Sequence, residues 1–362
     1  MRLAMLAARN SIHTTRWANA LSERGYTVHL ISQHQDGDPL HATVRFYQLP
    51  AKGFSGYFLN APKVKRLLAG IEPDLVHAHY ASGYGTLGRL SGFHPFVLSV
   101  WGTDVYDFPY KSFLHRRLMA GNLQAADWVC STSQVMARQT RKLWPDLKNM
   151  TVTPFGIDVN QFQPSAVSRQ PSAISHNITI GTVKTLRAKY GIDLLIRAFA
   201  KVRQQLPDLA DRLRLLIVGG GPQQAELEAL ATQLNLSDYT TFSGPVRHAE
   251  VPGYLRQLNI YIAASRDESF GVAVVEASAC GLPVIVSNVG GLPEVVEDGV
   301  TGLVVENENS SALAEAMICL VKSPALRRQM GAAGRRRVLE HYRWEDNVTT
   351  MEAVYQAVMR GT

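Results

Sequence analysis

The sequence of 362 residues predicts an α/β protein built from two doubly wound halves. Short, continuous apolar runs alternate with helical patterns along the chain, which is typical of parallel sheets covered on both faces. The chain is also longer than one hydrophobic core usually supports, so two domains of roughly 150–200 residues each are expected. Ligands of such sheets bind beyond the carboxyl ends of the strands, and we therefore expect both halves to face a common cleft.

The first half opens with a short buried strand at Leu3–Ala8. A helix is expected over residues 14–24, ending at Gly25, because glycine readily adopts the backbone of a helix end. A second helix is expected over about 111–126. The other apolar runs that we interpret as strands are Val28–Ser32, Asp74–His79, Phe96–Val100 and Trp128–Ser133.

Residues 159–176 are expected to link the two halves, because Ser, Gln and Pro dominate this stretch and no hydrophobic period is visible. We therefore expect one domain at residues 1–163 and another at residues 164–344. Strands of the second half are expected at Asn177–Val183, Leu213–Val218, Ile260–Ala263 and Pro283–Val286. Helices are expected over 191–205, 222–234 and 271–280, with closing helices of which the last is Asp346–Met359.

Composition excludes several classes of protein. Hydrophobic residues make up 46% and charged residues 19% of the chain, which argues against a disordered or collagen-like protein. No run approaches the roughly 20 apolar residues of a membrane span, and the first apolar run is too short for a signal peptide, so we expect a cytoplasmic protein. The three cysteines, Cys130, Cys280 and Cys319, lack metal-ligand spacing and are expected to be small buried hydrophobes.

The positive charge is concentrated in the first half. Residues 1–163 contain 17 Lys and Arg against 10 Asp and Glu, a net charge of +7, whereas the remainder contains 20 of each. An anionic partner is therefore expected for the first half. Basic and apolar side chains share the helix expected to contain residues 111–118, which suits weak, salt-sensitive contact with the inner face of the cell membrane. Merely solvated faces are the alternative. No nucleic-acid recognition motif is present.

The most informative motif is ESFGVAVVE, residues 268–276. Glu268 precedes, and Glu276 lies inside, the helix expected to open at Gly271. A helix start offers free backbone N–H groups and the positive end of a dipole, which favour a phosphate group. The two carboxylates can receive hydroxyls on either side of that group, so the spacing suits a sugar–diphosphate–ribose ligand. Two solvated glutamates are the alternative.

Glycine-rich turns around this motif complete a pattern that resembles a known family. Gly219–Gly221 follow an apolar strand, and Gly290–Gly291 open a further helix. In this order and spacing the motifs resemble retaining glycosyltransferases of family 4, most strongly over residues 178–305. The resemblance implies the GT-B fold, in which two Rossmann-like domains face each other across a cleft. It also implies a terminal helix, residues 345–362, that packs back on the first domain, and no cofactor or metal ion.

The resemblance implies a nucleotide-sugar site in the second half. Glu276 resembles the family glutamate that binds the nucleotide ribose, and Glu268 resembles the one that faces the donor sugar. Other residues implied in donor binding are Ser269, Phe270, Gly271 and Val272 in the turn, Gly220 and Gly221 upstream, and Val246 and Arg247 near a base expected to be uracil.

Lys184 and Lys189 are implied as the cations that balance the charge of a departing nucleoside diphosphate. The family commonly has an arginine at the first position, and lysine loses the bidentate fork of that side chain. Tyr190 intervenes before Gly191 and shifts the pair by one residue, so Arg187 is the alternative cation.

The first half departs further from the family. The loop at residues 9–14 lacks two glycines that many relatives have, and Trp101 replaces a histidine that usually lies beside the reacting carbon. His13, Trp101 and Asp104 are the acceptor-side candidates. Trp101 would form a platform for a sugar ring or pack in the core. Asp104 would orient the acceptor hydroxyl or cap the following turn.

The sequence therefore predicts a retaining, metal-independent hexosyltransferase. The donor would be a nucleoside-diphosphate sugar, expected to be UDP-linked, and the acceptor a glycan, a lipid-linked sugar or a cell-surface polysaccharide precursor. A GT-B-like nucleotide binder that lacks catalysis and serves in assembly is the alternative, kept open by Trp101 and the missing glycines. A dinucleotide oxidoreductase is disfavoured because Gln224 stands where its glycine motif needs the last glycine.

Overall fold

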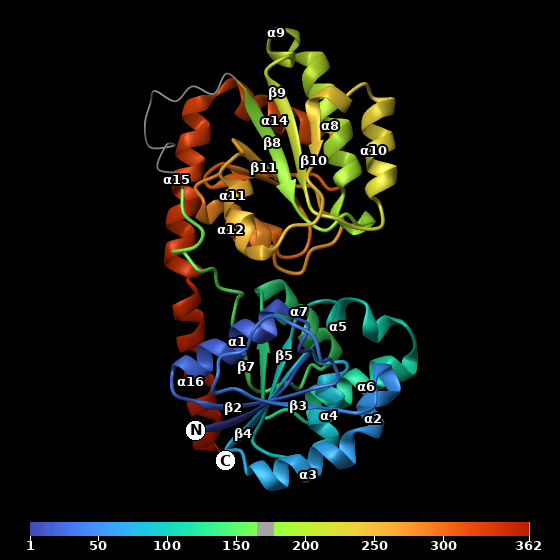
Figure 1. The fold of residues 1–362 in the computed structure, drawn as a ribbon, viewed down its shortest axis with the longest axis vertical. Helices are drawn as coiled ribbons and strands as arrows, with labels where there is room; N and C mark the ends of the chain where they lie inside the picture. Colours follow the sequence, from blue (N-terminus) through green and yellow to red (C-terminus); the bar gives the residue numbers. More distant parts are fainter. Residues whose placement is uncertain (165–176, 362) are drawn as a thin grey trace. The chain divides into compact units, whose positions relative to one another are not determined.

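The computed structural model describes residues 1–164 and 177–361, which form two compact units (Figure 1). Unit 1 combines Met1–Pro154 with the C-terminal Glu345–Thr362, and unit 2 comprises Phe155–Trp344. Each unit is built on one sheet whose strands pair in parallel and are connected by helices. The predicted fold class, two parallel-sheet α/β domains, is confirmed.

The sheet of unit 1 has seven strands in the order β3-β2-β1-β4-β5-β6-β7. The strand order reverses between β1 and β4, which is the point where doubly wound sheets place their ligands. The strands are β1 Arg2–Leu6, β2 Thr27–Ser32, β3 Arg45–Gln48, β4 Leu75–His79, β5 Phe96–Val100, β6 Trp128–Ser131 and β7 Met150–Val152. The helices are α1 Ile12–Glu23, α2 Gly53–Leu59, α3 Ala61–Ile71, α4 Tyr84–Ser91, α5 Thr103–Tyr106, η1 Phe108–Tyr110, α6 Phe113–Gln124 and α7 Gln134–Leu143.

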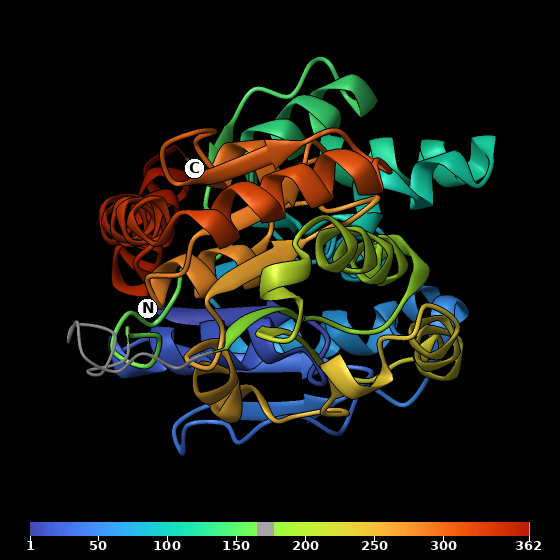
Figure 2. The same cartoon turned by 90° about the horizontal axis from the view of Figure 1, so that it is seen from above.

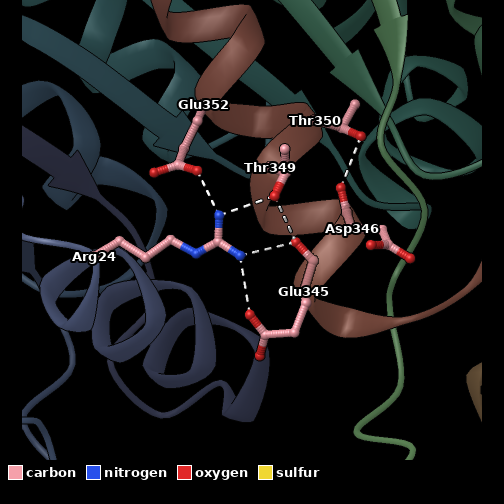
Figure 3. Close-up of polar contacts among 6 residues, drawn as sticks. All are labelled: Arg24, Glu345, Asp346, Thr349, Thr350 and Glu352. Carbon is pink, nitrogen blue, oxygen red and sulfur yellow. Dashed lines mark hydrogen bonds and ion pairs between the residues drawn. The ribbon is translucent and has the colours of Figure 1, made fainter.

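The last helix, α16 (Trp344–Gly361), packs on unit 1. The hydroxyl of Tyr355, fully buried, lies 2.7 Å from Nδ1 of His77 in β4. Arg24, just after α1, donates to the Glu345 carbonyl at 3.0 Å and to the Thr349 hydroxyl at 2.9 Å (Figure 3). Its guanidinium also pairs with the carboxylates of Glu345 at 2.9 Å and Glu352 at 2.5 Å. These contacts tie the C-terminal segment to the first sheet.

Unit 2 contains a six-stranded sheet in the order β10-β9-β8-β11-β12-β13, which reverses between β8 and β11. Helices α8 and α14 pack against each other over a core of aliphatic side chains from the sheet (Figures 1 and 2). The strands are β8 Ile178–Val183, β9 Leu213–Val218, β10 Thr240–Phe242, β11 Ile260–Ala263, β12 Val284–Ser287 and β13 Gly302–Val305. The helices are α8 Ile192–Gln205, α9 Pro207–Ala210, α10 Gln224–Gln233, α11 Val251–Leu255, α12 Val272–Ala279, α13 Leu292–Val295, α14 Ser310–Lys322 and α15 Pro324–His341, with short η3 Ala188–Tyr190, η4 Ser237–Tyr239 and η5 His248–Glu250.

The division between the units falls after Pro154, whereas we expected a boundary after residue 163. The segment between these points packs with unit 2. The ring of Phe155 lies 6.1 Å from that of Phe270, and the Phe162 carbonyl accepts a hydrogen bond of 2.6 Å from Arg335. Most of the expected linker, residues 165–176, lies outside the described residues.

One expectation about the cysteines is wrong. Cys130 and Cys280 are buried thiols, as expected, but Cys319 is exposed. It lies on the outer face of α14, one turn after the exposed Glu315. Among residues 1–164 and 177–361, no helix has both the length and the apolar character needed to cross a membrane.

We expect Arg24→Met to lower the free energy of unfolding of unit 1 by about 1 kcal/mol, because several charge-assisted hydrogen bonds to α16 are lost at a partly exposed site. The corresponding fall in melting temperature is roughly 2–4 °C, measurable by calorimetry. Arg141→Met, at an exposed position of α7, is the matched control. Equal melting temperatures for the two variants would show that Arg24 does not hold α16.

Candidate active site

The strand reversal in unit 2 brings two of the predicted residues together. Because β8 and β11 are neighbours, the loops that follow them leave the sheet side by side. Lys184 follows β8 directly, and Glu268 lies in the loop after β11. The ammonium of Lys184 donates to Oε2 of Glu268 at 2.6 Å. The two side chains are only 17% and 13% exposed, so the pair is largely shielded from water.

This ion pair keeps a positive charge at the carboxyl end of the sheet. Burial alone would lower the pKa of Lys184, but attraction by the Glu268 carboxylate outweighs burial, and the pKa lies above its ordinary value. Lys184 is therefore an ammonium at neutral pH. A carboxylate has several lone-pair directions, so Glu268 can hold Lys184 and still accept hydroxyl groups of a ligand.

Tyr190 contacts both predicted lysines. Its ring centroid lies 4.4 Å from Nζ of Lys184 and 5.0 Å from Nζ of Lys189, a distance at which ammonium groups are attracted to the ring. Gly191 follows with φ +61°, and a Cβ there would lie 1.9 Å from the Ala264 carbonyl oxygen after β11. The inserted tyrosine, a departure from the family pattern, thus lies against both cations.

Arg266 fastens the loop after β11 to the start of α8. Its guanidinium donates to both carboxylate oxygens of Asp193, at 2.8 and 2.7 Å, and to the carbonyl of Ala188 at 2.7 Å. Its backbone N–H donates to the Lys189 carbonyl at 2.7 Å. Sequence reasoning missed Arg266, because an arginine and an aspartate 73 residues apart give no local signal.

The glycine-rich turns pack on the backbone of this ion pair. A Cβ at Gly219 would lie 2.1 Å from the carbonyl oxygen of Lys184, and one at Gly290 would lie 1.8 Å from that of Glu268. A Cβ at Gly221 would similarly lie 2.3 Å from the Leu186 carbonyl oxygen. These glycines are therefore needed for close approach of protein backbone. Donor contact by Gly220 and Gly221 stays a prediction.

Glu276 lies in a second group with the loop after β10. Its side chain is buried in α12, and Oε1 lies 2.7 Å from Nε2 of His248. The ring of His248 packs on Phe162 at 5.5 Å between centroids. Val246 and Arg247, the predicted base-binding residues, directly precede His248. Arg247 is exposed and paired with Glu250 at 3.2 Å, as the cap of η5.

One residue in this group changes the prediction. His248 was not foreseen, although it directly follows the Val246–Arg247 motif in the sequence. It holds one oxygen of Glu276 and leaves the carboxylate with further lone pairs for hydroxyl groups.

The turn before α12 has the expected helix start. Gly271 is the N-cap residue with φ +106°, and a Cβ there would lie 2.8 Å from Cδ2 of Leu292. Val272 begins the helix, so Ser269 to Val272 lead into its backbone N–H groups. The ring of Phe270 is buried, 5.7 Å from that of Tyr342. Only the backbone of Phe270 can therefore meet a donor.

The strand reversal in unit 1 gathers a group of aromatic side chains. Trp101 follows β5, and its ring lies 4.9 Å from that of His79 at the end of β4 and 5.9 Å from that of His13 in α1. Burial, and to a smaller extent His13, lower the pKa of His79 to about 3, so this ring is neutral at physiological pH. Tyr80 adopts a strained φ of +79° beside them, as residues at functional sites often do. In the described part of the chain, no group of three or more His, Cys, Asp or Glu side chains could hold a metal ion.

Asp104 does not match the acceptor-binding role that we expected. It is fully buried, and its carboxylate accepts hydrogen bonds from the backbone N–H groups of Ala81 at 2.8 Å, Gly102 at 2.7 Å and Trp101 at 3.1 Å. The carboxylate is thus used within the protein to shape the Trp101–Gly102 turn. The capping alternative is not met either, because the donors to Asp104 precede it in the chain and no side chain caps α5. A buried carboxylate held in this way is not placed to touch an acceptor.

Both halves of the chain match known families. Residues 166–337 match the family of glycosyl transferases group 1, and residues 2–133 match the glycosyl transferase 4-like family. The chain is 30% identical over 312 residues to a D-inositol 3-phosphate glycosyltransferase of Kribbella flavida, covering 78% of this chain and 71% of the relative. It is 26% identical over 371 residues to N-acetyl-alpha-D-glucosaminyl L-malate synthase of Bacillus anthracis, covering 96% and 93%.

Solved structures show the same fold. A sucrose-phosphate synthase from Thermosynechococcus elongatus superposes with a TM-score of 0.84 at 24% identity, over all of both chains. HepE of Anabaena, solved in complex with UDP, superposes with a TM-score of 0.82 at 19% identity, over 99% of this chain and all of the other. With these matches to both halves of the chain, the chain belongs to glycosyltransferase family 4 and is a glycosyltransferase of the GT-B fold.

Proposed function

We propose that the protein is a retaining, metal-independent hexosyltransferase. Its donor is a nucleoside-diphosphate sugar, and we propose a UDP-linked one. The observation that carries this proposal is the Lys184–Glu268 pair of 2.6 Å at the strand reversal of unit 2. The structures of HepE with UDP and with UDP-glucose support a uridine donor. A GDP-linked donor is the variant to test beside it, because a relative of Mycolicibacterium smegmatis is named as GDP-mannose-dependent.

In this proposal the side chains of unit 2 divide the donor between them. Glu276, held by His248, accepts the ribose hydroxyls, and the loop at Val246 and Arg247 contacts the base. The diphosphate lies at the start of α12, where backbone N–H groups and the helix dipole favour an anion. Glu268 accepts hydroxyls of the hexose.

Lys184 and Lys189 supply the positive charge that the leaving group needs. When the bond between the anomeric carbon and the phosphate oxygen breaks, a negative charge develops on the diphosphate, and preorganised ammonium groups stabilise it. The acceptor oxygen bonds to the same face of the sugar, and its proton passes to a phosphate oxygen of the donor. The protein thus contributes position and charge rather than a dedicated base.

Unit 1 supplies the acceptor side of the reaction in this proposal. His13 and Trp101 remain the candidates, with the Trp101 indole as a platform for a sugar ring. The acceptor is a glycan, a lipid-linked sugar or a polysaccharide precursor. A lipid acceptor is supported by the M. smegmatis relative, which is named for transfer to a phosphatidylinositol monomannoside. We also infer contact of the basic unit 1 with the inner face of the cell membrane.

A screen of nucleotide sugars tests the proposal. The full chain is heated with UDP-, GDP- and ADP-linked hexoses, and the donor that raises the melting temperature most is assayed for hydrolysis and transfer in the presence of EDTA. We expect a UDP-hexose to be selected, activity to survive chelation, and the product to keep the anomeric configuration of the donor by NMR. Stabilisation without any turnover would favour the non-catalytic assembly protein, and an inverted product would contradict retention.

Glu268→Ala is expected to lower turnover by roughly a thousandfold, because it removes contacts to the hexose and frees Lys184. Glu276→Gln is expected instead to weaken binding of UDP by about 10–100-fold, the effect of losing a charged hydrogen-bond acceptor. Steady-state assays and calorimetric titration measure the two effects. Glu315→Gln, exposed on α14, is the control. Unchanged UDP affinity for Glu276→Gln contradicts the ribose assignment.

The ion pair itself can be tested without substrate. Glu268→Gln leaves a largely buried ammonium without its counter-ion and should lower the free energy of unfolding by about 1–3 kcal/mol, less than for a fully buried pair. Adding Lys184→Met should restore part of that loss. Urea unfolding of both variants and of Lys184→Met alone completes the cycle. Additive losses, in which the double variant loses the sum of what the two single variants lose, would contradict an interaction between these two charges.

A further inference from the structure

One side of unit 1 exposes an unusual number of large apolar side chains. They come from α2, from η1 and from the first turn of α6, which lie close together in the fold (Figure 1). Each is between 41% and 73% exposed. We call this set the aromatic surface; its members are Phe54, Phe58, Leu59, Tyr110, Phe113 and Leu114.

Ring contacts join the three elements into one surface. The ring of Phe54 lies 5.7 Å from Phe58 within α2, and 5.9 Å from both Phe108 of η1 and His115 of α6. Phe108 is buried beneath and lies 4.8 Å from His115. The exposed rings therefore stand on a packed base and are not the ends of a loose loop.

The start of α6 directs two of these side chains outward. Ser112 is the N-cap, and its hydroxyl accepts from the backbone N–H of His115 and contacts Nδ1 of that ring at 2.7 Å. Phe113 and Leu114 are thus the first two residues of the helix, and they are 71% and 73% exposed. Because these two adjacent apolar side chains are not buried in the protein's own core, they indicate a surface that is covered by a partner.

The charges around the aromatic surface are mostly positive. Residues 51–71 contain four Lys and Arg, and residues 108–126 contain three, while neither segment contains Asp or Glu. Lys52 precedes α2, and Lys111, Arg116 and Arg117 are exposed around the start of α6. The guanidinium of Arg117 lies 6.0 Å from the Phe113 ring. Asp107, which is exposed and directly precedes η1, is the acidic residue next to this surface, and Glu72 and Asp127 directly follow the two segments.

We propose that the aromatic surface inserts into the headgroup region of an anionic lipid bilayer, with the surrounding lysines and arginines on the lipid phosphates. Aromatic and leucine side chains flanked by basic residues are the combination that stabilises a protein at a membrane interface, where apolar burial and attraction to anionic lipid add together. The excess of basic over acidic residues around exposed aromatic side chains favours anionic lipid over another protein as the partner. The surface belongs to unit 1 and the proposed donor residues belong to unit 2, so the inference does not depend on the proposed chemistry.

Vesicle sedimentation of the full chain tests this proposal, with phosphatidylcholine vesicles that do or do not contain phosphatidylglycerol. We expect binding to the anionic vesicles that weakens as salt is raised. Phe113→Ser/Leu114→Ser should reduce the partition coefficient about tenfold or more, because both side chains are exposed and leave the fold intact. Val300→Ser, an exposed apolar residue of unit 2, should bind as the wild type does.

The contribution of charge is tested by Lys111→Ser/Arg116→Ser/Arg117→Ser, which should weaken binding and flatten its salt dependence. Arg138→Ser/Arg141→Ser/Lys142→Ser removes the same charge from α7 and should have a much smaller effect. Equal effects of the two triple variants, or wild-type binding by Phe113→Ser/Leu114→Ser, would overturn the assignment. If the wild type does not bind vesicles but forms a dimer, and Phe113→Ser/Leu114→Ser is monomeric, the surface is a protein interface instead. No nucleotide sugar is present, so failure here is distinct from failure of the transferase proposal.

Discussion

The proposed donor site depends on an ion pair between residues that are distant in sequence. Lys184 and Glu268 are 84 residues apart and meet at 2.6 Å because the sheet of unit 2 places β8 beside β11. Three neighbouring features keep the two side chains close together. The glycine turns admit the backbones of both residues, Arg266 fastens one loop to the next, and Tyr190 contacts the lysine. The result is an ammonium that keeps its charge in a site shielded from water.

The sequence predicted what leaves a local pattern. Buried parallel strands are continuous apolar runs, so β5 was expected at Phe96–Val100 and occurs there. Residues 268–276 lie before and within α12 as expected, and their contact with a donor stays a prediction. The edge strand β3, Arg45–Gln48, was missed because it is short, polar and half exposed. Helix α2 was missed because two glycines interrupt its seven residues.

How a side chain is used could not be predicted from its type and position. Asp104 and Phe270 stand where the family pattern places functional residues. Nevertheless, the carboxylate of Asp104 accepts hydrogen bonds from backbone N–H groups, and the ring of Phe270 is buried in the core. Arg266 and His248 were not predicted, because their partners, Asp193 and Glu276, belong to elements distant in sequence. The sequence thus predicted that Lys184 and Glu268 lie at strand ends, but not which groups the single side chains contact.

A crystal structure of the full chain with a bound UDP-hexose tests the central claim most directly. We predict that the diphosphate binds at the start of α12 beside Lys184 and Lys189. The ribose hydroxyls should donate to Glu276, and the hexose hydroxyls to Glu268. Electron density for the nucleotide sugar at another place, with the Lys184–Glu268 pair unchanged and Glu276 touching no ligand atom, would contradict it.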